Sequence, residues 1–388
     1  MRVATCVFMV VSMLVVHLDT VGADSTTIRW PAPGLRDLQS AIDVAPDGAT
    51  IQVAPGVYEI SQPIFVHQRL TVVGAGSGLT GPGQVTSLMG PTPQPVVDER
   101  GQLVLLATDV KGLFNVIGAG AVTFKDIQLS GFDAGIVGKN DAGGNAAPIA
   151  VENVVITNTG RGILFLSTAN LTVRDCIIAN TLWHGISVAP QLGGALLIPV
   201  LQVADAVIVN PAGAGIYFAF VAAHIEFADI LGARAGGIVG FHGQAGTSIL
   251  DSFLLANTEF GIQLFDTADA EIGNNRIVDT FATADGNFGT GVTVFSSEPA
   301  VLLSKADLHD NQIDTSALDG VLSFASDVTL QNDLITCSTF DLDVESVGGV
   351  LGSFEDGGGN LCGCPDAVNS CVVSSSQVLP PKMVGGLQ

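Results

Sequence analysis

Cationic residues are scarce in this sequence of 388 residues, which has 14 Lys and Arg against 37 Asp and Glu and a formal net charge of −23. Charged residues of either sign make up 13% of the chain, about half of the usual share. Binding to nucleic acid or to an anionic membrane surface needs clustered cations. The sequence therefore predicts neither partner.

Long apolar runs are also missing from the body of the chain, although the mean hydropathy is +0.50. The one long run near the start, residues 3–18, is short for a membrane span. Arg2 before it and the small residues at 21–23 after it are typical of a signal peptide. We therefore expect residues 1–23 to be removed, leaving a secreted, periplasmic or cell-surface chain that begins at Asp24 and has no membrane span.

Glycine is abundant, with 47 residues, and a Gly followed by Ile or Val recurs through the chain. The shortest separations between these pairs are 22 to 24 residues, and longer separations carry insertions. In most units an apolar residue is followed by Asn or Asp two positions later and by a turn residue seven positions later. A period of this length indicates a solenoid. The pairs begin at Gly135, Gly162, Gly185, Gly215, Gly237, Gly261, Gly291 and Gly320.

The turn positions hold residue types that tolerate a left-handed backbone at low cost. Between them lie segments of four to six residues rich in Ile, Val, Leu and Phe, which is the length and composition of strands. One unit cannot bury its apolar face alone, so the units should stack into parallel sheets at about 4.8 Å per coil. The expected turn positions are Gly131, Asn158, Asn180, Asn210, Gly232, Asn257 and Asp279, with the register near Ile249 open.

On this pattern residues 27–346 resemble the right-handed parallel β-helix, the pectin-lyase-like architecture. The predicted fold is all-β, a right-handed parallel β-helix solenoid with an N-terminal cap helix over residues 35–44. The expected organisation is a signal peptide at 1–23, the β-helix with its cap at 24–346 and a Cys-containing tail at 347–388. This fold carries lyases, hydrolases, epimerases and non-catalytic surface proteins, so the resemblance does not determine an activity.

Four cysteines, Cys337, Cys362, Cys364 and Cys371, gather near the C-terminal end. In an exported chain they predict two disulfides, with three possible connectivities. A zinc site is the alternative, but Cys-Gly-Cys lacks the usual spacing of zinc ligands and no His is near. Cys176 lies within a coil and is expected to be a buried free thiol. We expect no metal site and no cofactor.

Equivalent positions of successive coils form columns, so a site should appear as polar residues at matching offsets. On the strand that starts at each Gly pair, the residue after Gly should point inward and the next one outward. The outward columns hold a single Lys and no carboxylate, so neither a calcium site nor a pair of glycosidase carboxyls can be nominated there. The columns are Val137, Leu164, Ser187, Tyr217, Val239, Gln263, Thr293 and Leu322, then Lys139, Leu166, Ala189, Ala219, Phe241, Phe265, Phe295 and Phe324.

The best polar cluster consists of Arg161 and His184, which precede the Gly in adjacent coils, with Tyr217 one coil further on. An Arg that holds a carboxylate, with His or Tyr as acid or base, would suit lyase or epimerase chemistry on a uronic acid. These are the candidate catalytic residues. The alternative is that they are two exposed turn residues and one surface Tyr.

Two further candidates lie on the same side of the expected solenoid. The column that contains Phe241 and Phe265 would be a glycan-stacking platform if exposed, and an internal aromatic stack if the chain covers it. His242 and Asp266 occupy the same offset in adjacent coils and form either an orienting pair, weak metal ligands or an ordinary surface contact.

Two hypotheses for function follow. The first is a secreted or cell-surface protein that is structural or binds glycans without catalysis, because no catalytic set is recognisable. The second is a polysaccharide lyase or uronate epimerase acting on an acidic glycan. The expected partners are a polysaccharide or another cell-surface protein.

Overall fold

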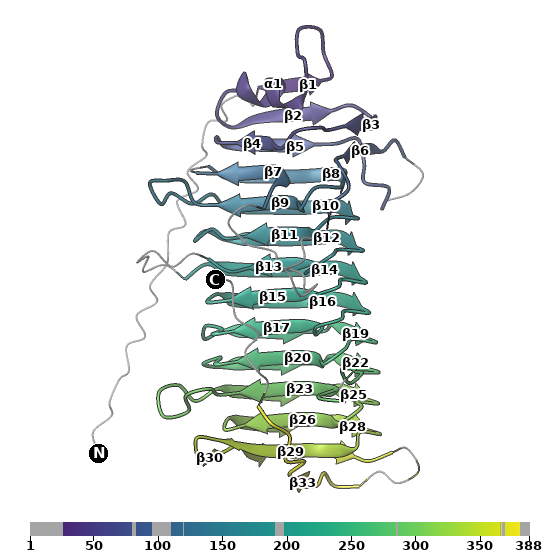
Figure 1. Ribbon diagram of the computed structural model, residues 1–388, viewed down its shortest axis with the longest axis vertical. Helices are drawn as coiled ribbons and strands as arrows, with labels where there is room; N and C mark the ends of the chain where they lie inside the picture. The colour runs from purple at the N-terminus through teal and green to yellow at the C-terminus, as the bar shows by residue number, and fades with distance from the viewer. Residues whose placement is uncertain are drawn as a thin grey trace, which may run out of the picture.

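In a computed structural model the chain is a right-handed parallel β-helix, with coils stacked along one long axis (Figure 1). The signal peptide expected at residues 1–23 lies outside the described residues. The structure describes residues 26–79, 83–94, 110–118, 120–190, 198–284, 286–364, 366 and 369–380.

Two sheets run the length of the solenoid, here called sheet A and sheet B. Sheet A has 20 strands, and the coils from β8 to β16 each contribute one long strand to it, whereas the coils before and after them contribute shorter strands. Its strands are β1 (Thr27–Trp30), β2 (Ala49–Val53), β3 (Gly56–Glu59), β5 (Leu70–Val73), β6 (Thr86–Met89), β8 (Val122–Ser130), β10 (Ile149–Thr157), β12 (Leu171–Ala179), β14 (Val200–Val209), β16 (Ala222–Leu231), β18 (Thr247–Leu250), β19 (Phe253–Leu255), β21 (Ala270–Gly273), β22 (Arg276–Val278), β24 (Lys305–His309), β25 (Gln312–Asp314), β27 (Asp327–Gln331), β28 (Leu334–Thr336), β31 (Ser353–Asp356) and β32 (Leu361–Cys362).

Sheet B has 13 strands and contains the segments that follow the repeated Gly. Its strands are β4 (Ile64–Val66), β7 (Gly112–Ile117), β9 (Ala134–Lys139), β11 (Arg161–Phe165), β13 (Ile186–Val188), β15 (Ile216–Ala219), β17 (Ile238–Phe241), β20 (Phe260–Phe265), β23 (Thr290–Phe295), β26 (Asp319–Phe324), β29 (Phe340–Val347), β30 (Val350–Leu351) and β33 (Val373–Ser374).

The register of sheet B confirms the predicted columns. The first outward column pairs residue for residue from Val137 to Leu322, and the second pairs from Ala219 to Phe324. The residue after each Gly points into the core, as expected, and is fully buried from Ile136 to Val321. These inward side chains form one continuous core along the axis, since each coil covers the apolar edge of the next.

The corners between strands carry the left-handed backbone that the residue types predicted. Asn158, Asn180 and Asn210 have φ of 53°, 54° and 51°. The prediction for Asn257 is wrong, because Ala256 takes the left-handed conformation instead, with φ of 57°. Asn257 is buried next to that corner, where its Oδ1 accepts a hydrogen bond from the Ala233 N–H at 2.9 Å.

A short helix, α1 (Leu38–Asp43), lies at the N-terminal end of the stack (Figure 1). It begins where Asp37 accepts a hydrogen bond from the Ser40 N–H at 2.7 Å, a typical N-cap contact. Leu38, Ala41 and Ile42 are buried on its inner side. The helix is shorter than the predicted residues 35–44, and its role as a cap stays a prediction.

The C-terminal end of the stack is held by two disulfides, which confirms the prediction for these four cysteines. The bonds join Cys337 to Cys364 and Cys362 to Cys371. Cys176 is free and buried, and burial raises the pKa of its thiol to about 12. Strands β31 and β32 continue sheet A to Cys362, so strand pairing extends past residue 346.

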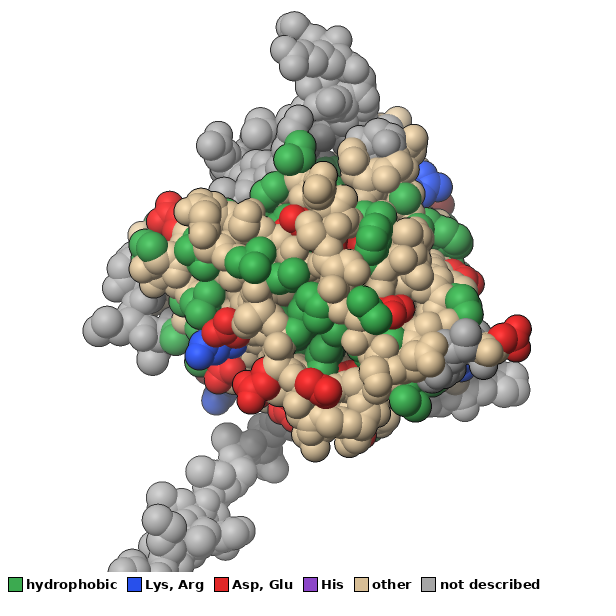
Figure 2. All heavy atoms as spheres, turned by 90° about the horizontal axis from the view of Figure 1, so that it is seen from below, with side chains coloured by type: hydrophobic (Ala, Val, Ile, Leu, Met, Phe, Trp, Pro, Cys, Tyr) green, Lys and Arg blue, Asp and Glu red, His purple; other side chains and the backbone are tan. Residues whose placement is uncertain are grey.

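Apolar side chains remain exposed at this end, where no further coil covers them. Figure 2 looks onto it and shows hydrophobic side chains near the centre, with acidic side chains around the margin. Leu351, Leu361 and Val372 are among the exposed apolar residues. No helix in the described part of the chain is long and apolar enough to cross a membrane.

Candidate functional site

The outer face of sheet B is apolar and covered. Val137, Leu164 and Leu322 point outward from this sheet, yet all three are fully buried. Towards the N-terminal end Val110 packs against these outward side chains, and towards the C-terminal end Val347 and Val378 do so. Most of this face is therefore closed to a large ligand in the described structure.

Aromatic rings form a continuous row along this face. Ring centroids of consecutive members lie 4.3 to 5.6 Å apart. Phe265 is 1% exposed, so neither side of its ring is open to a sugar, whereas Phe241 is half-buried. The proposed glycan contact of Phe241 and Phe265 stays a prediction. The row consists of His184, Tyr217, Phe241, Phe265, Phe295 and Phe324.

A segment near the C-terminus, residues 373–378, here called the C-terminal strap, covers the end of this row. Ser376 donates hydrogen bonds to Asp343 from its backbone N–H at 2.9 Å and from its hydroxyl at 2.5 Å. The Gln377 N–H donates to Glu345 at 2.6 Å. Val378 packs against the Phe cluster. The strap is thus fastened by carboxylates of β29 and closes the face over the aromatic rings.

Asp343 has a second buried carboxyl beside it, Asp319, and both side chains are fully buried. The Thr290 hydroxyl donates to Asp319 at 3.1 Å, and protonated Asp319 forms a side-chain hydrogen bond with Asp343. Burial, and after it the charge of Asp343, raises the pKa of Asp319 to about 8. Asp319 therefore keeps its proton at neutral pH, which avoids two adjacent buried charges.

Arg161, His184 and Tyr217 come together in consecutive coils at the edge of this face. Arg161 is 1% exposed, and its Nε and Nη1 have no partner. Burial lowers its pKa to about 10, against the raising effect of Asp133. The His184 Nδ1 accepts a hydrogen bond from the Ala214 N–H at 2.9 Å, and its ring stacks on Tyr217 at 5.0 Å.

The pKa shifts define the charges of this cluster at neutral pH. Burial, then the charge of Arg161, lowers the pKa of His184 far below its usual range, so the imidazole is neutral. Burial raises the pKa of Tyr217 to about 12, so the phenol keeps its proton. Only Arg161 is charged, and it is enclosed. A catalytic role for the three residues stays a prediction.

The other predicted pair, His242 and Asp266, also comes together, with the His Nδ1 3.8 Å from the carboxylate. Asp266 is buried and accepts hydrogen bonds from the N–H and hydroxyl of Ser297, at 2.7 and 2.5 Å. His242 stacks on Phe220 at 4.8 Å. The carboxylate is already satisfied by Ser297, so its main contacts are structural.

Part of the outer face of sheet A is open and polar, in contrast to sheet B. A groove of about 610 Å³ crosses strands β16, β18, β21, β24 and β27 on this face. Its lining contains three carboxylates, two imidazoles and several hydroxyl or amide groups, and neither Lys nor Arg. The lining residues are His224, Gly246, Thr247, Ser248, Asp269, Ala270, Glu271, Asp307, Leu308, His309, Thr329 and Gln331.

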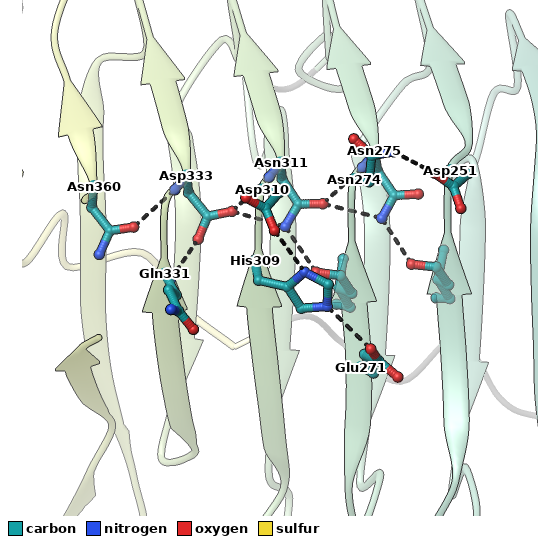
Figure 3. Close-up of polar contacts among 12 residues, drawn as sticks. Asp251, Glu271, Asn274, Asn275, His309, Asp310, Asn311, Gln331, Asp333 and Asn360 are labelled. Carbon is teal, nitrogen blue, oxygen red and sulfur yellow. Dashed lines mark hydrogen bonds and ion pairs between the residues drawn. The ribbon is translucent and has the colours of Figure 1, made fainter. Parts of the chain in front are cut away.

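His309 stands between two carboxylates in this groove (Figure 3). Its Nε2 lies 3.1 Å from Glu271 Oε1, which comes from the adjacent coil, and its Nδ1 lies 3.2 Å from Asp310 Oδ2. Both ring nitrogens face acceptors, an arrangement that favours the doubly protonated imidazolium. Partial burial works against that charge, but Glu271 and Asp310 outweigh it and raise the pKa of His309.

Gly273 provides the space in which the His309 ring lies. It is the register partner of His309 in the adjacent coil. A Cβ atom at position 273 would overlap the imidazole carbon and both ring nitrogens. The backbone of Gly273 is not left-handed, so its conformation does not require glycine. Glycine is needed here because the ring approaches the backbone closely.

A buried ladder of amide and carboxylate side chains supports the adjoining corner (Figure 3). Each member accepts the backbone N–H of the residue one coil earlier, at 2.9 to 3.0 Å. Asp310 occupies the left-handed corner beside this ladder, with φ of 56°. The ladder therefore fixes the coil-to-coil position of the strand that carries His309. It consists of Asn275, Asn311, Asp333 and Asn360.

Asp307 and Lys305 point outward from the same strand as His309, since the three alternate with buried residues. Asp307 is exposed and forms no hydrogen bond or ion pair with the described residues, so its carboxylate is available as a base. Lys305 lies outside the groove lining. No group of three or more His, Cys, Asp or Glu in the described ranges is arranged to hold a metal ion.

The sequence columns missed this site because they followed only the strand after each Gly pair. Glu271 and His309 are 38 residues apart, across a unit lengthened by an insertion. The available signal was the alternation Lys305, Asp307, His309 within one predicted strand, followed by the corner residue Asp310. Extending the column search to the strand before the corner would have found it.

No protein-family model matches the sequence, and no curated protein matches it. Among solved structures, the A-module of a mannuronan C-5 epimerase from Azotobacter vinelandii is 15% identical with a TM-score of 0.52, and the match covers 80% of this chain and 94% of that one. The catalytic unit of a GH87 α-1,3-glucanase from Streptomyces thermodiastaticus is 15% identical with a TM-score of 0.52, covering 87% and 69%.

A periplasmic alginate epimerase is 11% identical with a TM-score of 0.53, covering 87% of this chain and 83% of that one. At these identities the likeness shows the fold alone. The similar structures are parallel β-helix enzymes, and their names describe both epimerases and a glucanase.

Proposed function

We propose that this chain is an exported polysaccharide-acting enzyme whose acid–base site is the groove on sheet A. The observation that carries the proposal is His309, held between Glu271 and Asp310 in an open groove with the unpaired carboxylate of Asp307 on the same strand. The signal-peptide pattern and two disulfides support export.

The groove favours hydrolysis over lyase or epimerase chemistry. Abstraction of a proton next to a uronate carboxylate needs a cation that neutralises that carboxylate, and the groove lining contains no Lys or Arg. Glycoside hydrolysis needs a proton donor and a carboxylate base or nucleophile. The His309–Glu271 pair holds a transferable proton, and Asp307 provides the carboxylate.

In the proposed reaction the glycosidic C–O bond breaks while the leaving oxygen receives the proton held by the His309–Glu271 pair. Asp307 takes a proton from water, and the water oxygen forms the new bond to the anomeric carbon. The raised pKa of His309, caused by Glu271 and Asp310 against the effect of partial burial, favours the form that carries this proton.

A panel of polysaccharides tests the proposal, with reducing-end release measured for hydrolysis, ultraviolet absorbance for unsaturated lyase products and NMR for epimerised sugars. We expect reducing ends, and a loss of about 100-fold or more in rate for His309→Gln and for Asp307→Asn. His67→Gln is the matched control, because this exposed His lies outside the groove.

Reducing-end release that His309→Gln leaves unchanged would contradict the assignment of the site. Unsaturated or epimerised products instead of reducing ends would support the lyase or epimerase hypothesis. Binding without any product would support the hypothesis of a non-catalytic glycan-binding protein.

A further inference from the structure

Carboxylates on the outer face of sheet A follow one another from coil to coil. The register places Ser248, Glu271, Asp307, Thr329 and Glu355 in one outward row across five successive coils. Neighbouring strands are about 4.8 Å apart, so Glu271 and Asp307 lie close together along the axis, and Glu355 follows after Thr329. A polymer that lies along the groove would meet these groups in turn.

The same row has a different character in the earlier coils. There it reads Thr123, Ala150, Thr172, Gln202 and His224, with no carboxylate. Within this row the acids are therefore concentrated where the groove and His309 are, whereas the neighbouring outward row carries Glu152 and Glu226 in earlier coils. Because Asp269 also lines the groove and Lys305 does not, the lining is negative even when His309 is protonated.

Two other occupants fit this lining less well. A metal ion needs several converging ligands, and the described residues contain no such group. A polyuronate would bring carboxylates against Asp269, Glu271 and Asp307 without any lining Lys or Arg, which is electrostatically unfavourable. A substrate with cationic donors would instead form charge-assisted hydrogen bonds to the same three groups.

We infer that the groove selects a glycan whose sugar units carry free amino groups. The expected cleavage of such a glycan rests on the proposed function. The expected binding of such a glycan rests on the groove alone. Asp269, Glu271 and Asp307 together supply the negative charge that attracts the ammonium groups, while Ser248, Thr329 and Gln331 supply groups that can hydrogen-bond to hydroxyl groups.

Binding of three soluble polymers at low ionic strength tests this inference. The polymers are a deacetylated β-1,4 glucosamine chain, its fully N-acetylated oligomer as the neutral match, and a polyuronate. We expect the amino polymer to bind most tightly, the N-acetylated oligomer less tightly and the polyuronate least. Added salt should weaken only the binding of the amino polymer. Glu271→Gln combined with Asp307→Asn should weaken binding of the amino polymer about tenfold.

A matched control is required, because a chain of net charge −23 attracts any polycation. Glu59→Gln combined with Glu298→Gln removes two exposed carboxylates outside the groove and makes the same change in net charge. We expect this control to leave binding within twofold of the wild type.

Equal loss of binding in both double variants, or equal affinity for the neutral and amino polymers, would overturn the inference. Cleavage of the neutral polymer that depends on His309, without preference for the amino polymer, would overturn it while the proposed function stands. Selective binding of the amino polymer without cleavage of any polymer would support it and contradict the proposed function.

Discussion

The two outer faces of this solenoid are built from the same coils and have opposite surroundings. On sheet B the outward positions are apolar and are buried under other parts of the chain, including the C-terminal strap. On sheet A the outward residues around His309 are polar and line an open groove. An apolar outward column thus marks a covered face of a solenoid, and the chemistry is to be sought on the other face.

The largest difference between the faces should appear in stability. Phe324→Ala removes a fully buried ring from the covered face and should lower the free energy of unfolding by about 3–5 kcal/mol. Leu250→Ala, at a half-buried outward position on sheet A, is the comparison and should cost about 1 kcal/mol. Denaturant unfolding measures both, and equal costs would mean that the face of sheet B is not closed in solution.

The next effect concerns the fastening of the C-terminal strap. Cys362→Ala combined with Cys371→Ala removes the disulfide that precedes the strap and should cost about 2–4 kcal/mol. We also expect faster hydrogen exchange at residues 373–378, while the groove of sheet A keeps its activity. Hydrogen exchange by mass spectrometry reads both regions, and unchanged protection of the strap would contradict this prediction.

An effect that depends on pH should come from Asp319 on the covered face. Its pKa is raised in the folded chain, so the stability due to its bound proton is present below its unfolded pKa of about 3.9 and is lost as pH rises towards 8. Asp319→Asn should therefore flatten the decline of stability over this range. Thermal unfolding from pH 4 to 9 measures it, and an unchanged slope would show that Asp319 is not the group responsible.

The smallest effect belongs to the open face. Glu271→Gln should lower the pKa of His309, because it removes a carboxylate 3.1 Å from the imidazole. The raised pKa of His309 contributes stability below about pH 6.5, which is lost as pH rises through the folded value. The variant should therefore differ from the wild type by less than about 1 kcal/mol at pH 6 and by nothing measurable at pH 9.

NMR titration of the His309 imidazole measures this shift directly, with His224 as an internal reference in the same groove. A pKa that rises or does not change in Glu271→Gln would show that the pair does not form in solution.

Much of the fold could be predicted from the sequence, because the solenoid repeats its physical requirements in every coil. The inward Ile and Val after each Gly and the left-handed Asn corners follow from burial and backbone sterics alone. The exception at Ala256 arose where one unit has an extra residue and a neighbouring Asn moved into the core.

The candidate site was less predictable, because it depends on which face the rest of the chain covers. The Phe column looks the same in sequence whether it is exposed or lies under the C-terminal strap. His309 and Glu271 become neighbours only through stacking of two coils. Arg161, His184 and Tyr217 did come together as expected, but Arg161 is fully buried, which no column of residue types records.

The contact between His309 and Gly273 also bears on how such a chain could lengthen in evolution. Solenoids grow by duplication of single coils, and in the early part of this chain an added coil would leave the residues of the groove in contact with one another. Between β21 and β24, however, an inserted coil would separate the imidazole from its glycine and from Glu271 at once. Coil number should therefore vary among descendants of this chain on the N-terminal side of the groove and stay constant across it.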